Sequence, residues 1–88
     1  MLPVKRKATV ITPEDVIQIK AIAETAKQIR IKTGLSYEGF AARHGIHRLT
    51  YYKFERGDQN FTIATLLKVI RGLGLTMPKF FILVDEPK

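Results

Sequence analysis

The sequence of 88 residues contains no cysteine. That absence excludes both a disulfide framework and a thiolate zinc site, and it gives no sign of an oxidising compartment. A chain this short is expected to form one domain, because a core of this size cannot be divided and stay stable. Stability must therefore come from packing within the chain or against a second copy.

Long apolar runs are also absent. No stretch approaches the ~20 apolar residues of a membrane span, and the N-terminal "MLPVKRKATVI" lacks the apolar and small-residue pattern of a secretion signal. The sequence therefore predicts a cytoplasmic protein that does not cross a membrane. Acids are scarce as well: eight Asp and Glu stand against fifteen Lys and Arg, and the formal charge of +7 favours a polyanionic partner.

Patterns typical of catalysis and metal binding are missing too. The chain has no cysteine nucleophile, no Ser-His-acid arrangement that the spacing supports and no phosphate-cradling glycine loop, and it is short for a substrate cavity. His44 and His47 lie three residues apart, but no third metal ligand accompanies them. The expectation is a protein that is not an enzyme and that needs no metal or cofactor.

The chain begins with a basic arm, residues 1–12, in which Lys5, Arg6 and Lys7 precede the β-prone "ATVI". Such an arm is either disordered with nonspecific affinity for nucleic acid or placed in a DNA minor groove. A helix is then predicted over 13–33, because Thr12 can cap it and Pro13 suits its first position. Its apolar stripe runs to Gly34 and consists of Val16, Ile19, Ile22 or Ala23, Ala26, Ile29 and Thr33.

Three shorter helices follow, each with its own start or stop signal. Ser36 is expected to cap a second helix of about eight residues, which Gly45 ends in a tight turn. A third helix is predicted from 47 or 48 to 56, before Gly57. Thr62 is expected to cap the fourth, whose apolar stripe consists of Ile63, Leu66, Leu67, Ile70 and Leu73.

The stretch "FFILV", residues 80–84, is more apolar than a chain end requires, and it precedes a polar tail at 85–88. In one interpretation Phe80 and Phe81 cover the core as part of a last short helix. In another, 82–84 pairs as a strand with "ATVI" near the N-terminus, within the chain or across a dimer. Apolar surface together with a small core favours a homodimer.

Two short helices joined by a glycine turn are a helix-turn-helix arrangement. Over about residues 22–81 the sequence resembles the DNA-binding domains of the phage Cro and repressor type, the XRE family. The residues that carry this resemblance are Gly34-Leu35-Ser36, Ala41, Gly45-Ile46, Glu55-Arg56-Gly57, and the pattern of Leu66, Ile70 and Leu73. It implies an all-α, lambda-repressor-like domain of four to five helices over 13–84, with short terminal strands if 82–84 pairs as above.

The family's function implies that the third helix enters the major groove of double-stranded DNA. On the helical period Tyr51 and Phe54 face the core, while the candidate base contacts, Arg48, Leu49, Tyr52 and Lys53, face outward. A bidentate contact from Arg48 to guanine would contribute roughly 1 to 3 kcal/mol of discrimination. Leu49 can only pack on a thymine methyl group.

Further site residues follow from the resemblance alone. Positions matching the family's phosphate contacts are Tyr37, His47, Arg56, Asn60 and Phe61. Tyr37 stands where glutamine is common in the family, and His47 where serine or threonine is common. Arg30 and Glu55 match positions that form an internal ion pair, which would explain the single acid inside a basic stretch.

The resemblance implies a sequence-specific transcriptional regulator that binds a palindromic operator as a dimer. The alternative is an antitoxin-type module that holds a toxin through "FFILVDEPK" or the first helix and represses its own operon. An RNA-binding function would need exposed tyrosines that stack on unpaired bases, so burial of Tyr51 would count against it.

Overall fold

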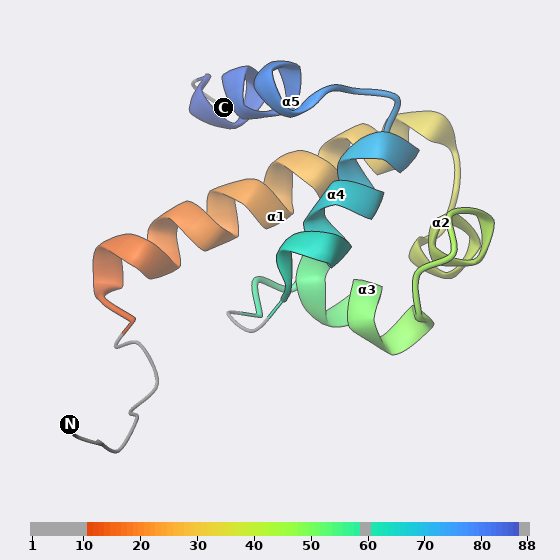
Figure 1. Ribbon diagram of the computed structural model, residues 1–88, viewed down its shortest axis with the longest axis horizontal. Helices are drawn as coiled ribbons and strands as arrows, with labels where there is room; N and C mark the ends of the chain where they lie inside the picture. Colours follow the sequence, from red (N-terminus) through yellow and green to blue (C-terminus); the bar gives the residue numbers. More distant parts are fainter. Residues whose placement is uncertain (1–10, 59–60, 87–88) are drawn as a thin grey trace, which may run out of the picture.

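The computed structural model describes residues 11–58 and 61–86. Five α-helices account for most of these residues, and Figure 1 shows their arrangement. The fold agrees with the all-α expectation. Most of the predicted N-terminal arm, including Lys5, Arg6 and Lys7, lies outside the described residues. The helices are α1 Pro13–Thr33, α2 Tyr37–Arg43, α3 Arg48–Glu55, α4 Ile63–Gly72 and α5 Met77–Asp85.

Helix α1 begins and ends where the sequence predicts. The Thr12 hydroxyl accepts a hydrogen bond from the Asp15 N–H at 3.2 Å, and the Asp15 carboxylate accepts one from the Thr12 N–H at 3.1 Å. This reciprocal capping box satisfies two of the N–H groups that a helix start leaves unpaired. Gly34 ends α1 with φ of 84°, a left-handed conformation that only glycine adopts at no steric cost.

The α2–α3 turn is held by both its own backbone and α4. Gly45 has φ of 69°, and the N–H of Ile46 donates to the Ala41 carbonyl at 2.9 Å. The Ile46 side chain is buried, which anchors the turn in the core. Lys68 of α4 donates from Nζ to the Gly45 carbonyl at 3.3 Å. The turn that sets the direction of α3 is therefore fixed from two sides.

Aromatic side chains from several helices fill the core. The largest fully buried side chains are Tyr51, Phe40, Phe54, Phe80 and Val69. The predicted stripe of α4 is right at Leu66 and Ile70 but wrong at its N-terminal end and at Leu67: Ile63 is 65% exposed and Leu67 40%. Val69 takes their place inside. On α1, Ala23 and Ala26 are buried as expected, whereas Thr33 is exposed.

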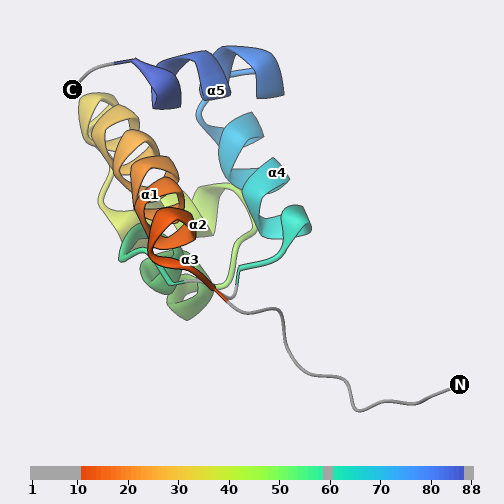
Figure 2. The ribbon, with the colours of Figure 1, turned by 90° about the vertical axis from the view of Figure 1, so that its left-hand side faces the viewer.

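The strand considered for residues 82–84 is wrong, because these residues lie within α5. The Thr76 hydroxyl caps the helix by accepting from the Lys79 N–H at 3.4 Å, and Pro78 stands in the first turn. Helix α5 crosses the ends of α1 and α4 on the side of the molecule opposite α3 (Figures 1 and 2). Phe80 is fully buried there, so covering of the core by the last helix is the interpretation that holds.

The described residues include no strand. Among the same residues, 11–58 and 61–86, no helix combines the length and the apolar character that crossing a bilayer needs.

Gly72, the last residue of α4, packs directly against α2. A Cβ at this position would lie 2.8 Å from His44 Cγ and 2.9 Å from Phe40 Cζ. Gly72→Ala is expected to destabilise the protein, because overpacking a core costs about 1–3 kcal/mol. That cost exceeds the roughly 0.5–1 kcal/mol by which Ala stabilises a helix relative to Gly.

Urea unfolding of Gly72→Ala measures this effect. Gly39→Ala in α2 is a matched control, because it also gains helix propensity while its nearest new contact, Ser36 Oγ, would be 3.3 Å away. If Gly72→Ala proves at least as stable as the wild type, close packing of α4 on α2 at this point is contradicted.

Candidate nucleic-acid interface

Helix α3 turns one side to the core and the other to solvent. Tyr51 and Phe54 have 0% and 1% of their surface exposed, whereas Leu49 is 50% and Tyr52 37% exposed. The predicted inward and outward phases of this helix are therefore confirmed. The side chains proposed as base contacts all lie on the exposed side: Arg48, Leu49, Tyr52 and Lys53.

Packing of aromatic rings fixes the inward side of α3. The Tyr51 ring lies 5.0 Å, between centroids, from Phe40 of α2 and 6.0 Å from Phe54. The Phe54 ring in turn meets Phe61 edge to face at 5.0 Å. The pairs with Phe40 and Phe61 link α3 to other segments and stabilise a particular rotation of the helix, because tilted and edge-to-face rings have preferred geometries. The outward residues are thereby held in a fixed orientation.

The residues that match phosphate contacts are distributed over α2 and both ends of α3. Tyr37 is the half-buried first residue of α2, His47 is exposed at the start of α3, and Arg56 is exposed at its end. Phe61 is half-buried with its ring against Phe54, so contact with a phosphate there would fall to the backbone N–H. Asn60 lies outside the described residues.

His47 makes no side-chain capping bond to α3. Histidine is a weaker N-cap than the serine or threonine common in the family at this position. The other histidine, His44, packs its ring 4.5 Å from the Phe40 ring. Within 11–58 and 61–86 the structure brings together no three potential metal ligands among His, Cys, Asp and Glu.

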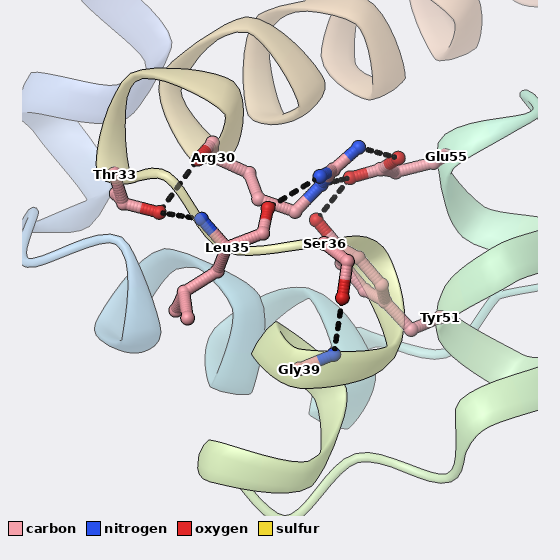
Figure 3. A network of polar contacts seen from close by, with 7 residues as sticks. All are labelled: Arg30, Thr33, Leu35, Ser36, Gly39, Tyr51 and Glu55. Atoms are coloured by element: carbon pink, nitrogen blue, oxygen red, sulfur yellow. Dashed lines mark hydrogen bonds and ion pairs between the residues drawn. The ribbon is translucent and has the colours of Figure 1, made fainter.

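A buried polar network joins the ends of α1 and α3 (Figure 3). Arg30 Nε lies 2.5 Å from Glu55 Oε2, and Arg30 Nη2 donates to Glu55 Oε1 at 3.0 Å. Arg30 Nη1 also donates to the Leu35 carbonyl at 2.7 Å. The Tyr51 hydroxyl donates to the same carboxylate at Oε2. One guanidinium therefore ties α1, the segment before α2, and α3 together.

The pKa shifts in this network follow from its contacts. The hydrogen bond to Glu55 raises the pKa of Arg30 further above its already high value, against an opposing effect of burial. Burial, followed by the hydrogen bond to Glu55, raises the pKa of the Tyr51 hydroxyl far above its usual range. Tyr51 therefore stays protonated at neutral pH and acts as a donor.

The resemblance in sequence predicts the ion pair of Arg30 and Glu55. The helical period places Tyr51 in the core and predicts no partner for its hydroxyl. The spacing of Tyr51 and Glu55, four residues apart on one helix, is the signal that would have linked them. A second contact of this spacing, between Tyr52 and Arg56, was also missed: Arg56 Nη1 donates to Tyr52 Oη at 3.2 Å.

Arg30→Met is expected to lower the free energy of unfolding by about 3–5 kcal/mol, because it strands the Glu55 carboxylate, whose side chain is 8% exposed. Tyr51→Phe should cost less, about 1.5–3 kcal/mol, since it removes one hydrogen bond to a charged group. Urea unfolding measures both. Lys32→Met, at an exposed position in the same last turn of α1, is the control; equal costs for Arg30→Met and Lys32→Met would refute the role given to the pair.

Comparison with known proteins identifies the family. A helix-turn-helix family model matches residues 27–80. The control protein C.MunI from a Mycoplasma species is 35% identical over 65 residues, covering 74% of this chain and 88% of that protein. The control protein C.SmaI from Serratia marcescens is 33% identical over 58 residues, covering 66% of this chain and 69% of that protein.

Among solved structures, the restriction-modification controller protein C.Esp1396I is similar to this chain with a TM-score of 0.69 and 25% identity. The match covers 76% of this chain and 88% of that one, which was solved as a tetramer in complex with its natural 35 base-pair operator. These relatives are control proteins, and they give no support to the antitoxin alternative. The chain belongs to the helix-turn-helix family.

Proposed function

We propose that this chain is a transcriptional regulator that binds double-stranded DNA sequence-specifically, with α3 in the major groove of its operator. The observation that carries the proposal is the exposed side of α3, where Arg48, Leu49 and Lys53 project from a helix locked into the core behind them. A major groove about 12 Å wide admits one such helix. The similar controller protein C.Esp1396I was solved in complex with its operator, which supports DNA binding by a protein of this fold.

The chemistry of the exposed residues indicates what α3 reads. The guanidinium of Arg48, in the first turn of α3, can donate two hydrogen bonds to guanine O6 and N7. Leu49 has no hydrogen-bonding group and packs on a thymine methyl, while Lys53 offers a less directional donor. The operator is therefore expected to contain guanine and thymine within reach of one helix.

Phosphate contacts are proposed at the start of α2 and at both ends of α3. His47 and Arg56 flank the helix, and Tyr37 begins α2. Asn60 and the backbone of Phe61 complete the proposed set. Contacts of this kind fix the register of the protein on the duplex without carrying sequence information.

The proposed active species is a homodimer on a palindromic operator. Two copies of α3 about 34 Å apart meet successive major grooves on one side of the duplex. The small core and exposed apolar side chains such as Ile82, which is 60% exposed, favour association with a second copy. The tetramer formed by C.Esp1396I on its operator supports assembly of this kind.

The proposed function is DNA binding alone, without catalysis and without a cofactor. The proposed location is the cytoplasm, at the nucleoid. A contribution of Tyr51 to RNA binding is disfavoured, because its ring is fully buried and cannot stack on an unpaired base.

Selection from random duplex DNA with the purified protein tests the proposal directly. The expected product is an enriched inverted repeat whose half-sites are separated by about one helical turn. The protein's mass in solution should be that of at least two copies. Failure to enrich any duplex, or stronger retention of single-stranded RNA than of duplex DNA, would refute the function proposed here.

Loss of the Arg48 guanidinium should relax base preference. Arg48→Ala is expected to weaken binding to the selected operator by roughly 1–3 kcal/mol and to remove discrimination at one or two base pairs. Arg56→Ala should weaken binding to all duplexes alike. It should also reduce, by about one, the magnitude of the slope of the logarithm of the binding constant against the logarithm of the salt concentration. Arg71→Ala, which removes an exposed arginine from the end of α4, is the control for charge alone.

Equilibrium binding to the operator and to a panel of single base-pair variants gives these quantities. An equal loss on every duplex for Arg48→Ala would show that Arg48 contacts phosphate and does not read a base.

A further inference from the structure

Tyr52 connects α2 to the end of α3. The centroid of its ring lies 5.1 Å from that of Tyr37, with the two planes tilted by 44°. The guanidinium carbon of Arg56 lies 5.4 Å from the same centroid, and Arg56 Nη1 donates a hydrogen bond to Tyr52 Oη at 3.2 Å. Both the ring and the hydroxyl of Tyr52 are therefore already engaged within the protein.

We infer that Tyr52 is a positioning residue, which orients the Arg56 guanidinium for a DNA phosphate through the contact between Tyr37, Tyr52 and Arg56. The inference rests on the proposed function and deepens it, because it takes Tyr52 out of the proposed set of base contacts. Base reading then falls to Arg48, Leu49 and Lys53.

The fixed end of this contact lies in the core. Tyr37 is half-buried and packs against the cluster of buried side chains that includes Phe40 and Tyr51. Its ring limits the positions open to Tyr52, which is 37% exposed. Tyr52 in turn restricts Arg56, which is exposed and would otherwise sample many rotamers. Packing against the core thus restricts the orientation of the Arg56 guanidinium at the surface.

The chemistry of Arg56 suits a phosphate. Guanidinium carries five N–H donors in a planar fork, and the bond to Tyr52 engages only one nitrogen. The remaining donors can meet phosphate oxygens in the bidentate geometry that arginine prefers. Because Tyr52 restricts the arginine before DNA arrives, less rotamer freedom is lost on binding.

The contact between Tyr37 and Tyr52 also means that α2 supports α3 differently here than a glutamine at the position of Tyr37 would. Glutamine is common in the family at the position of Tyr37, and an amide side chain can both donate and accept a hydrogen bond. In this chain Tyr37 instead meets α3 through ring packing on Tyr52. The two helices therefore contact one another here through aromatic rings. The Tyr52 ring also makes a cation–π contact with Arg56.

A double-mutant cycle on DNA binding tests the inference. Dissociation constants are measured for wild type, Tyr52→Leu, Arg56→Ala and the double variant on the selected operator and on its single base-pair variants. Tyr52→Leu should weaken binding about two- to tenfold, the ratio that corresponds to ordering one long side chain. The factor should be the same on every duplex, so that base preference is unchanged.

In the Arg56→Ala background, Tyr52→Leu should cause no further loss. Leu49→Ala is the matched control, because it removes another exposed side chain of α3. It should change base preference, and its fold-loss of affinity should multiply with that of Arg56→Ala. Tyr52→Phe keeps the ring and loses only the hydroxyl, so its effect should be smaller than that of Tyr52→Leu. Urea unfolding of each variant establishes that it is folded at the assay temperature.

Three results would overturn the inference. A change of preference at a particular base pair for Tyr52→Leu would make Tyr52 a base reader, and multiplicative losses with Arg56→Ala would show that it acts independently of Arg56. Unchanged affinity in folded Tyr52→Leu would show that the contact has no role in binding. Absence of duplex binding by the wild type is a separate outcome, which overturns the proposed function and this inference with it.

Discussion

The bidentate ion pair between Arg30 and Glu55 is the interaction on which the arrangement of the helices depends. A carboxylate this deeply buried is tolerated only when charge and hydrogen bonds compensate it. Arg30 supplies the charge, and the Tyr51 hydroxyl supplies a further donor. Because Arg30 also binds the Leu35 carbonyl, the same residue sets the relation of α1 to the segment that begins α2 and to the end of α3.

Burial of Glu55 also determines the charge that α3 presents to solvent. It is the only acid between His47 and Gly57, and its charge is neutralised inside the protein by Arg30. The exposed side of α3 therefore carries the charges of Arg48, Lys53 and Arg56 without an acid of its own. A surface of one sign raises the rate of encounter with a polyanion. The buried Glu55 therefore has two effects: it completes the structural ion pair, and it leaves the exposed side of α3 positively charged.

Local signals in the sequence predicted most of the helices and the phase of α3. Hydroxyl caps at Thr12, Ser36 and Thr62 and the glycines at 34 and 45 act within one turn, so they can be read without the fold. The strand interpretation of residues 82–84 gave weight to their apolar character. In the structure the cap at Thr76 and burial of Phe80 decide in favour of a helix.

The helical period of the sequence could not predict features that depend on tertiary geometry. Exposure of Ile63 and Leu67 depends on which part of α4 its neighbours cover, and the sequence does not contain that information directly. The inward turn of the Phe61 ring depends on Phe54, and the contact between Tyr37 and Tyr52 depends on the angle between α2 and α3. A resemblance in sequence predicts that Tyr37, Tyr52 and Phe61 belong to a site, but only the packing shows which of their groups are exposed.

The run "YYKFER", residues 51–56, shows how one short segment serves both the core and the surface. Neighbouring residues on a helix point about 100° apart, whereas residues four apart share a face. Tyr51 therefore meets Glu55 on the buried side, and Tyr52 meets Arg56 on the exposed side. The first hydroxyl donates to an acid and the second accepts from a base. The two adjacent tyrosines therefore contact opposite charges on opposite sides of α3: the acid lies in the network that holds the helix in place, and the base lies on the surface proposed to meet DNA.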